Sequence, residues 1–271
     1  MLLTLEKLFL WFLFYSCCGW VYESILVSVR ERRPVNRGFL NGPLCPIYGT
    51  GAVLGIVVLG QVHDNPVLVF VVSSIGACLL EYFTSWAMEK LFHARWWDYS
   101  HYRFNLNGRI CLLGAIVFGI GGVVIVDVVQ PRVAEVTDMM PAPVVHWLSF
   151  VFLVLTALDT AITVAGIVHF EDSLDQLAAM VAKYGDAMKE RVGDAVSGAS
   201  DMVGDALGDS LQSGKEMSTE FMLKVREAAD SVFNRQQRRM IASFPRLRAD
   251  RNNEALQELR DAFDKLRRGR K

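Results

Sequence analysis

Long apolar stretches alternate with short polar segments over the first 170 residues of the chain. An α-helix needs about 20 apolar residues to cross the ~30 Å hydrocarbon core of a bilayer. The pattern predicts five transmembrane helices, at Leu8–Val29, Ile47–Val62, Val67–Met88, Ile110–Val129 and Val144–His169. The second is the shortest and follows Pro43 and Pro46, so the segment from Gly38 to Pro46 is a candidate re-entrant or interfacial stretch. We therefore expect an all-α polytopic membrane protein.

The charge density changes sharply near residue 170. Residues 1–169 carry 10 basic and 11 acidic side chains, whereas residues 170–271 carry 18 of each. This division predicts a transmembrane helical domain over 1–169 and a charged, amphipathic helical tail over 170–271.

Charges in the short loops predict the orientation of the chain. The first and third loops carry eight basic residues: Arg30, Arg32, Arg33, Arg37, Lys90, Arg95, Arg103 and Arg109. The other two loops carry one, Arg132. Basic residues of short loops stay on the cytoplasmic side, so we expect the N-terminus outside and the tail in the cytoplasm.

The tail itself is divided by charge. Residues 170–223 hold 4 basic and 11 acidic side chains, and residues 224–271 hold 14 basic and 7 acidic ones. A folded-back hairpin, an antiparallel dimer or another partner helix would bring opposite charges together. Alternatively, the basic part rests on anionic lipid. Phe244-Pro245 is expected to separate two helices, the last at Arg251–Arg270, and no nucleic-acid partner is expected.

Ionisable side chains interrupt three of the apolar stretches. Glu23, Glu81 and Asp159 would lie at membrane depth, where a charged group costs about 2.5–3.5 kcal/mol and normally faces a partner or a cavity. Arg37 and Arg109 stand at the cytoplasmic entrances of the second and fourth spans. These side chains are candidates for a substrate or ion path, and polar contacts between helices are the alternative, favoured for Asp159.

The cytoplasmic loops and spans carry sequence segments that resemble a known family. These are G-W-V-Y-E at 19–23, N-R-G-F-L-N-G-P-L-C-P-I-Y-G at 36–49, E-Y-F-T-S-W-A-M-E at 81–89, and R-W-W-D-Y-S with F-N-L-N-G-R-I-C-L across 95–112. They resemble the bacterial ABC-transporter type IV permease family, also called CmpB-like, over about residues 8–168. The resemblance implies a small multi-pass protein of the bacterial plasma membrane. Tyr48, Asp98 and Asn105 match its pattern and join the candidate path.

Transport is the leading functional hypothesis. Five spans make a small unit for a solitary transporter in the lipid bilayer, so we expect a homodimer or association with other subunits. The chain has no G-x-x-x-x-G-K-[ST] segment to bind ATP, so an ATPase would be a separate subunit. The alternatives are a membrane enzyme acting on a phosphate-bearing lipid, with Glu23 or Glu81 as base, and a scaffold without catalysis. No cofactor or metal site is expected. Trp96 and Trp97 are expected at the membrane interface, and Gly51-x-x-x-Gly55 would allow close helix packing.

Overall fold

The computed structural model describes residues 1–60, 64–199 and 220–268, of which residues 188–199 and 262–268 are described by backbone only. Four helices are long and apolar enough to cross a membrane: α1 (Leu2–Glu31), α3 (Pro66–Phe92), the continuous stretch Leu112–Asp138, and α6 (Ala142–Ile167) with the start of the helix that follows it. This confirms an all-α polytopic membrane protein and reproduces four of the five predicted spans.

The helix at the second predicted span is shorter than expected. α2 (Pro46–Leu59) has 14 residues, about 21 Å at 1.5 Å per residue, which is less than the ~30 Å core. Pro46 occupies the first turn, where its missing N–H costs no hydrogen bond. The predicted end of the span, Val62, lies outside the described residues.

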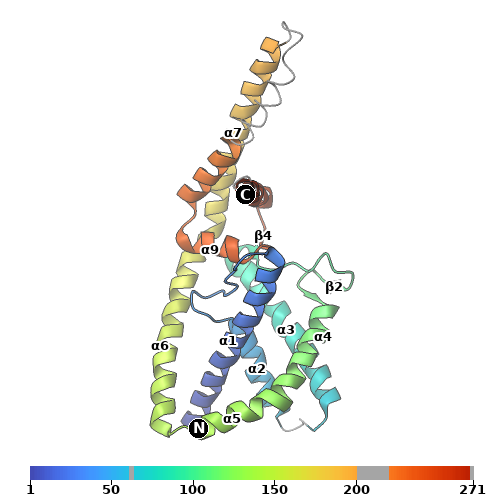
Figure 1. Ribbon diagram of the computed structural model, residues 1–271, viewed down its shortest axis with the longest axis vertical. Helices are drawn as coiled ribbons and strands as arrows, with labels where there is room; N and C mark the ends of the chain where they lie inside the picture. Colours follow the sequence, from blue (N-terminus) through green and yellow to red (C-terminus); the bar gives the residue numbers. More distant parts are fainter. Residues whose placement is uncertain (61–63, 200–219, 269–271) are drawn as a thin grey trace.

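The third long stretch consists of three segments. α4 (Leu112–Val123) passes into the π-helix η1 (Val124–Val129) and then into α5 (Gln130–Asp138). α4 packs closely along α3, while α5 turns across the end of the bundle where the N-terminus lies (Figure 1). The five helical passes therefore place the N-terminus and the tail at opposite ends of the bundle.

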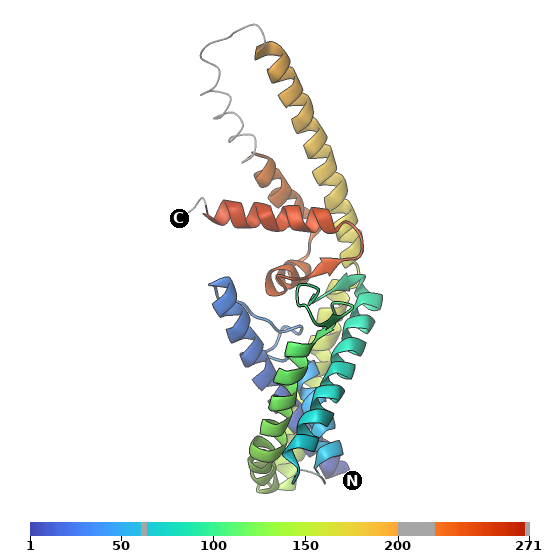
Figure 2. The ribbon, with the colours of Figure 1, turned by 90° about the vertical axis from the view of Figure 1, so that its right-hand side faces the viewer.

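The tail folds back on itself. α7 (Phe170–Ala199) extends from α6 beyond the bundle, and a helix over residues 220–232 returns beside it (Figures 1 and 2). Leu174, Leu177 and Val225 are buried in one apolar cluster between the two helices. Of the alternatives for the tail, the described residues adopt the hairpin within one chain.

Two further helices connect the hairpin to the bundle. α9 (Arg235–Ser243) begins with a capping box of Asn234 and Gln237, and α10 (Asn253–Arg268) runs across the long axis of the molecule (Figure 2). The predicted break between these helices at Phe244-Pro245 is present.

The tail packs directly on a loop of the membrane bundle. β1 (Ala94–Arg95) follows α3 and pairs in antiparallel fashion with β4 (Arg248–Ala249) from the tail. Trp96 is 1% exposed and stacks edge-to-face on Phe244, in the same apolar cluster as the hairpin. Its expected place in an interfacial belt was therefore wrong, because the tail covers it.

Glycines allow α1 and α2 to approach closely. A Cβ at Gly49 would lie 2.2 Å from the Phe12 carbonyl oxygen, and one at Gly19 would lie 2.3 Å from the Tyr48 ring. A Cβ at Gly55, by contrast, would meet no atom within 4 Å, and one at Gly51 would touch only Leu80, at 3.4 Å. The close contact thus uses Gly19 and Gly49 and not the Gly51-x-x-x-Gly55 motif.

Gly49→Ala should destabilise the bundle by about 1–3 kcal/mol, because the added methyl group meets a backbone oxygen that cannot move without shifting α1. Thermal unfolding of the purified protein in detergent measures the effect. Gly55→Ala is the matched control on the same helix and should leave the melting temperature unchanged or raise it slightly. Equal effects of the two substitutions would contradict the close-packing interpretation.

Candidate functional site

A cluster of polar side chains lies where the loop of residues 32–45 meets the inner end of the bundle, the end that carries the tail. The Tyr48 hydroxyl on α2 donates a hydrogen bond of 2.5 Å to Glu23 on α1. The Arg37 Nε atom lies 3.5 Å from the other oxygen of the same carboxylate. Three predicted site residues from two helices and a loop therefore meet directly.

Glu81 on α3 belongs to the same region and has a different kind of partner. Its side chain is buried, with 6% of the residue exposed, and it accepts a 2.9 Å hydrogen bond from the Tyr99 hydroxyl. Burial raises the pKa of Tyr99, and the neighbouring carboxylates of Glu81 and Glu23 raise it further. The phenol thus stays protonated, donates to Glu81 and lies within electrostatic reach of both glutamates.

Burial has the largest effect on the pKa values of two residues of the loop beside this cluster, Arg37 and Cys45. It lowers the pKa of Arg37, and the nearby Glu23 carboxylate opposes that effect. Burial, followed by Glu23, raises the pKa of the Cys45 thiol to about 12. Cys45 is therefore a neutral, unreactive thiol at neutral pH, while Arg37 stays charged beside Glu23.

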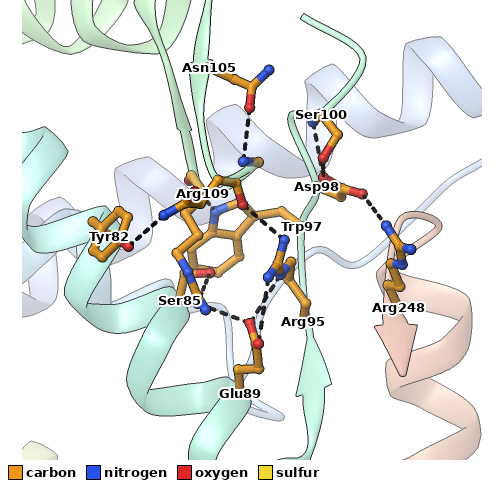
Figure 3. A network of polar contacts seen from close by, with 12 residues as sticks. Tyr82, Ser85, Glu89, Arg95, Trp97, Asp98, Ser100, Asn105, Arg109 and Arg248 are labelled. Carbon is orange, nitrogen blue, oxygen red and sulfur yellow. Dashed lines mark hydrogen bonds and ion pairs between the residues drawn. The ribbon is translucent and has the colours of Figure 1, made fainter. Parts of the chain in front are cut away.

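The other predicted arginine has a different partner from the one expected. Arg109 Nη1 lies 2.9 Å from Glu89 and 3.4 Å from the Ser85 hydroxyl, and Arg95 binds the same Glu89 carboxylate at 3.0 Å (Figure 3). Glu81, Ser85 and Glu89 follow one another at four-residue intervals on α3, so they share a face. The Arg109 guanidinium thus pairs with Glu89, the third residue of this face, and not with Glu81, the first.

Asp98 and Asn105 organise the loop that holds Arg109. Asn105 accepts a hydrogen bond from the Gly108 N–H, and Asp98 accepts from Ser100 and Arg248 (Figure 3). Burial alone would raise the pKa of Asp98, but these hydrogen bonds outweigh it and lower the pKa. Gly108 has a φ of +66°, and a Cβ there would lie 2.5 Å from Asp98, so only glycine fits this turn.

Asp159 binds the backbone of the loop of residues 32–45 and does not join the glutamates. One of its oxygens accepts from the Asn41 N–H and side chain, both at 2.9 Å, and the other accepts from the Gly42 N–H at 2.7 Å. Thr163 also donates to it. Asp159 thus binds the loop and Thr163 of its own helix, and its place in the candidate path stays a prediction.

An arginine of the tail binds the same loop from its other side. Arg239 on α9 donates from Nη1 to the carbonyls of Gly38 and Leu40, both at 3.0 Å, and from Nη2 to Phe39 at 2.6 Å. Burial lowers the pKa of Arg239, and the Asp159 carboxylate opposes this. The carbonyl groups of residues 38–40 therefore accept hydrogen bonds from the Arg239 guanidinium, and the N–H groups of Asn41 and Gly42 donate to the Asp159 carboxylate.

The loop in turn caps the tail helix. Arg33 donates to the Ala242 carbonyl at 3.0 Å, Arg37 donates to the Ser243 carbonyl at 3.3 Å, and the Arg37 guanidinium lies 4.0 Å from the centre of the Phe244 ring. The last carbonyls of a helix carry partial negative charge, so cations are favourable there. The tail thus covers the loop side of the glutamate cluster.

The structure therefore groups the eight predicted site residues into three sets. Glu23, Arg37, Tyr48 and Glu81 converge, Arg109, Asp98 and Asn105 form the neighbouring loop network, and Asp159 anchors a loop. Tyr99, Glu89 and Arg239 were not among the predicted site residues. The four-residue spacing from Glu81 placed Glu89 on the same polar face of the helix, and Tyr99 matched the family pattern, but nothing local marks Arg239. Among the residues whose side chains the structure describes, no three potential metal ligands of the Cys, His, Asp and Glu types gather.

Arg239→Ala should loosen the loop of residues 32–45, because three carbonyls lose a charged donor that contributes about 1–3 kcal/mol per buried bond. Hydrogen exchange measures this, and the amides of the loop should exchange about tenfold faster or more. Arg238→Ala is the control on the same helix, because its side chain is 45% exposed and pairs with the Asp230 carboxylate, not with the loop, among the described residues. Unchanged loop exchange in Arg239→Ala would contradict the proposed role of this contact.

Comparison with known proteins identifies the family. A search of curated proteins and a search of solved structures each found no match. A family profile described as "Putative ABC-transporter type IV" matches residues 10–164, more than half of the chain, and spans the loop of residues 32–45, Glu81 and the Arg109 network. The chain belongs to this ABC-transporter type IV family, as its loop and helix motifs indicated.

Proposed function

We propose that the protein is a transport component of the membrane whose inner site, formed by Glu23, Glu81 and Tyr99, binds a proton or a small cation. The observation that carries this proposal is the environment of Glu81. This carboxyl group is buried at membrane depth, and its one hydrogen bond among the described residues comes from a neutral phenol. A charged carboxylate there would need a cation, and a neutral one would need a proton.

The charge balance of the cluster supports the same conclusion. Glu23 has a cationic partner in Arg37, whereas Glu81 has none among the ion pairs of the described chain. Arg109, which could have neutralised it, is engaged by Glu89. With Arg37 charged, two ionised glutamates would leave an excess negative charge, and a proton or cation would remove it.

The tyrosines give the site a way to change its occupancy. Tyr99 and Tyr48 each donate one hydroxyl to one glutamate, and both hydroxyls can rotate to release it. Arg37 lies between Glu23 and the tail, so displacement of the tail would free the guanidinium at the mouth of the site. We infer a path that opens toward the end of the bundle that carries the tail.

We extend the proposal to orientation and assembly. The basic loops and the tail lie at one end of the bundle, which the charge bias assigns to the cytoplasm of a bacterial cell. We propose that the N-terminus lies outside, and that the protein works as a homodimer or with an ATPase subunit. The membership in an ABC-transporter family supports the second partner.

Glu81→Gln should abolish the ion response of the site, because an amide cannot take up a proton and does not replace the carboxylate charge. Infrared difference spectroscopy on the reconstituted protein, after a pH step or addition of Na⁺ or K⁺, should show a carboxyl signal that this variant loses. Ion flux into inside-out membrane vesicles, which retain native partners, should fall about tenfold or more.

Glu135→Gln serves as the matched control, because Glu135 is exposed on α5 at the far end of the bundle. It should keep both the infrared signal and the flux. A Glu81→Gln protein that inserts, stays folded and still responds like the wild type would refute the ion site. A variant that unfolds would instead assign Glu81 to helix packing.

Gentle extraction of the tagged protein from its native membrane tests the assembly. If the chain is a permease component, mass spectrometry should recover an ATPase subunit in about equal amount, since the chain contains no nucleotide-binding loop of its own. Recovery of the protein alone, or with lipid only, would contradict the ATPase partner and would leave the homodimer as the working unit.

A further inference from the structure

A groove runs along the outer surface of the bundle between α3 and α4 and is lined by residues other than those of the glutamate cluster. This open groove has a volume of about 690 Å³, within the roughly 300–1,000 Å³ range of ligand pockets. Its walls are nearly all apolar and include Ile75, Leu79, Phe83 and Trp86 on α3 and Ala115 on α4. Leu79 and Phe83 are more than 60% exposed, so in a membrane this groove opens to lipid.

The inner end of the groove is built by the loop network described above. Leu106 and Ile110 of the short hairpin between β2 (Asn105–Leu106) and β3 (Ile110–Cys111) line it. Tyr82 is also part of the wall. Its hydroxyl accepts a hydrogen bond of 3.0 Å from the Asn107 side chain, and the Arg109 guanidinium lies 5.5 Å from the centre of its ring. The end wall is therefore fixed by polar contacts and is part of the fold.

Exposed basic residues flank, in sequence, the segments that form this inner end. Lys90 is exposed and stands four residues after Trp86, on the same face of α3. Arg103 is exposed three residues before Leu106, with its guanidinium 5.7 Å from the centre of the Phe104 ring. The nearby acid, Glu89, is bound by Arg95 and Arg109, so it does not neutralise this rim.

We propose that this groove is a binding site for one anionic phospholipid of the inner leaflet. An acyl chain lies along the apolar wall, and the phosphate binds at Lys90 and Arg103. Basic residues at the inner surface of a membrane attract anionic head groups, and long basic side chains extend toward the interface to reach them. The combination of an apolar groove and a cationic rim at one end matches an amphiphile with a negative head. The site is independent of the proposed ion site.

Native mass spectrometry of the full chain, reconstituted in nanodiscs of equal phosphatidylcholine and phosphatidylglycerol, tests the proposal. The wild type should retain about one lipid per chain, with phosphatidylglycerol strongly preferred. Ala115→Trp fills the groove and should lower the retained lipid about tenfold. Ala161→Trp is the control, because Ala161 is exposed on α6, outside the groove. It should retain lipid as the wild type does.

The double variant Lys90→Ala, Arg103→Ala addresses the head group without touching the groove wall. It should keep a bound lipid but lose the preference for phosphatidylglycerol. Arg30→Ala, at an exposed position on α1, should leave that preference intact. Undiminished lipid in Ala115→Trp, or an undiminished preference in the double variant, would overturn the proposal. So would a wild-type dimer that Ala115→Trp separates without loss of lipid, because the groove would then bind a second copy of the chain.

Discussion

The backbone of the loop of residues 32–45 lacks the regular hydrogen bonds of a helix or strand, and the side chains of Arg239 and Asp159 bind five of its polar groups. The guanidinium binds three successive carbonyls and the carboxylate binds two successive N–H groups of the same turn. Buried backbone groups left unpaired would cost free energy at each position. This complementary pair lets an irregular loop hold a fixed shape at the inner end of the bundle.

The Glu23 side of the inner face depends on that fixed loop. It places Arg37 beside Glu23 and leads into α2, which carries Tyr48 to the same carboxylate. The neighbouring loop is fixed separately, through Asp98, Asn105 and Gly108, and it brings Tyr99 to Glu81 and Arg109 to Glu89. The polar cluster is thus assembled by two loops, each held in place in part by residues of the tail.

Periodicity and charge were sufficient to predict the long helices, the break at Phe244-Pro245 and the convergence of Glu23 with Arg37. They could not predict which arginine meets which acid. Arg109 is not at a four-residue helical spacing from Glu81 or from Glu89. Which of the two acids it meets depends on how the loop turns at Gly108. Arg239 binds backbone carbonyls, which every residue type has, so no partner side chain marks the contact. The prediction for Trp96 was wrong because the tail, which is distant in sequence, packs on this side chain and removes it from the interface.

The contact between Arg239 and the loop has a consequence for the synthesis of the chain. Arg239 is translated 201 positions after Gly38, a delay of about 10–40 s at 5–20 residues per second. Throughout that interval the carbonyls of residues 38–40 must be bound by water, lipid head groups or the insertion machinery. The contact between this loop and the tail therefore forms only after all of the membrane helices have been synthesised, and until then the tail does not cover Trp96.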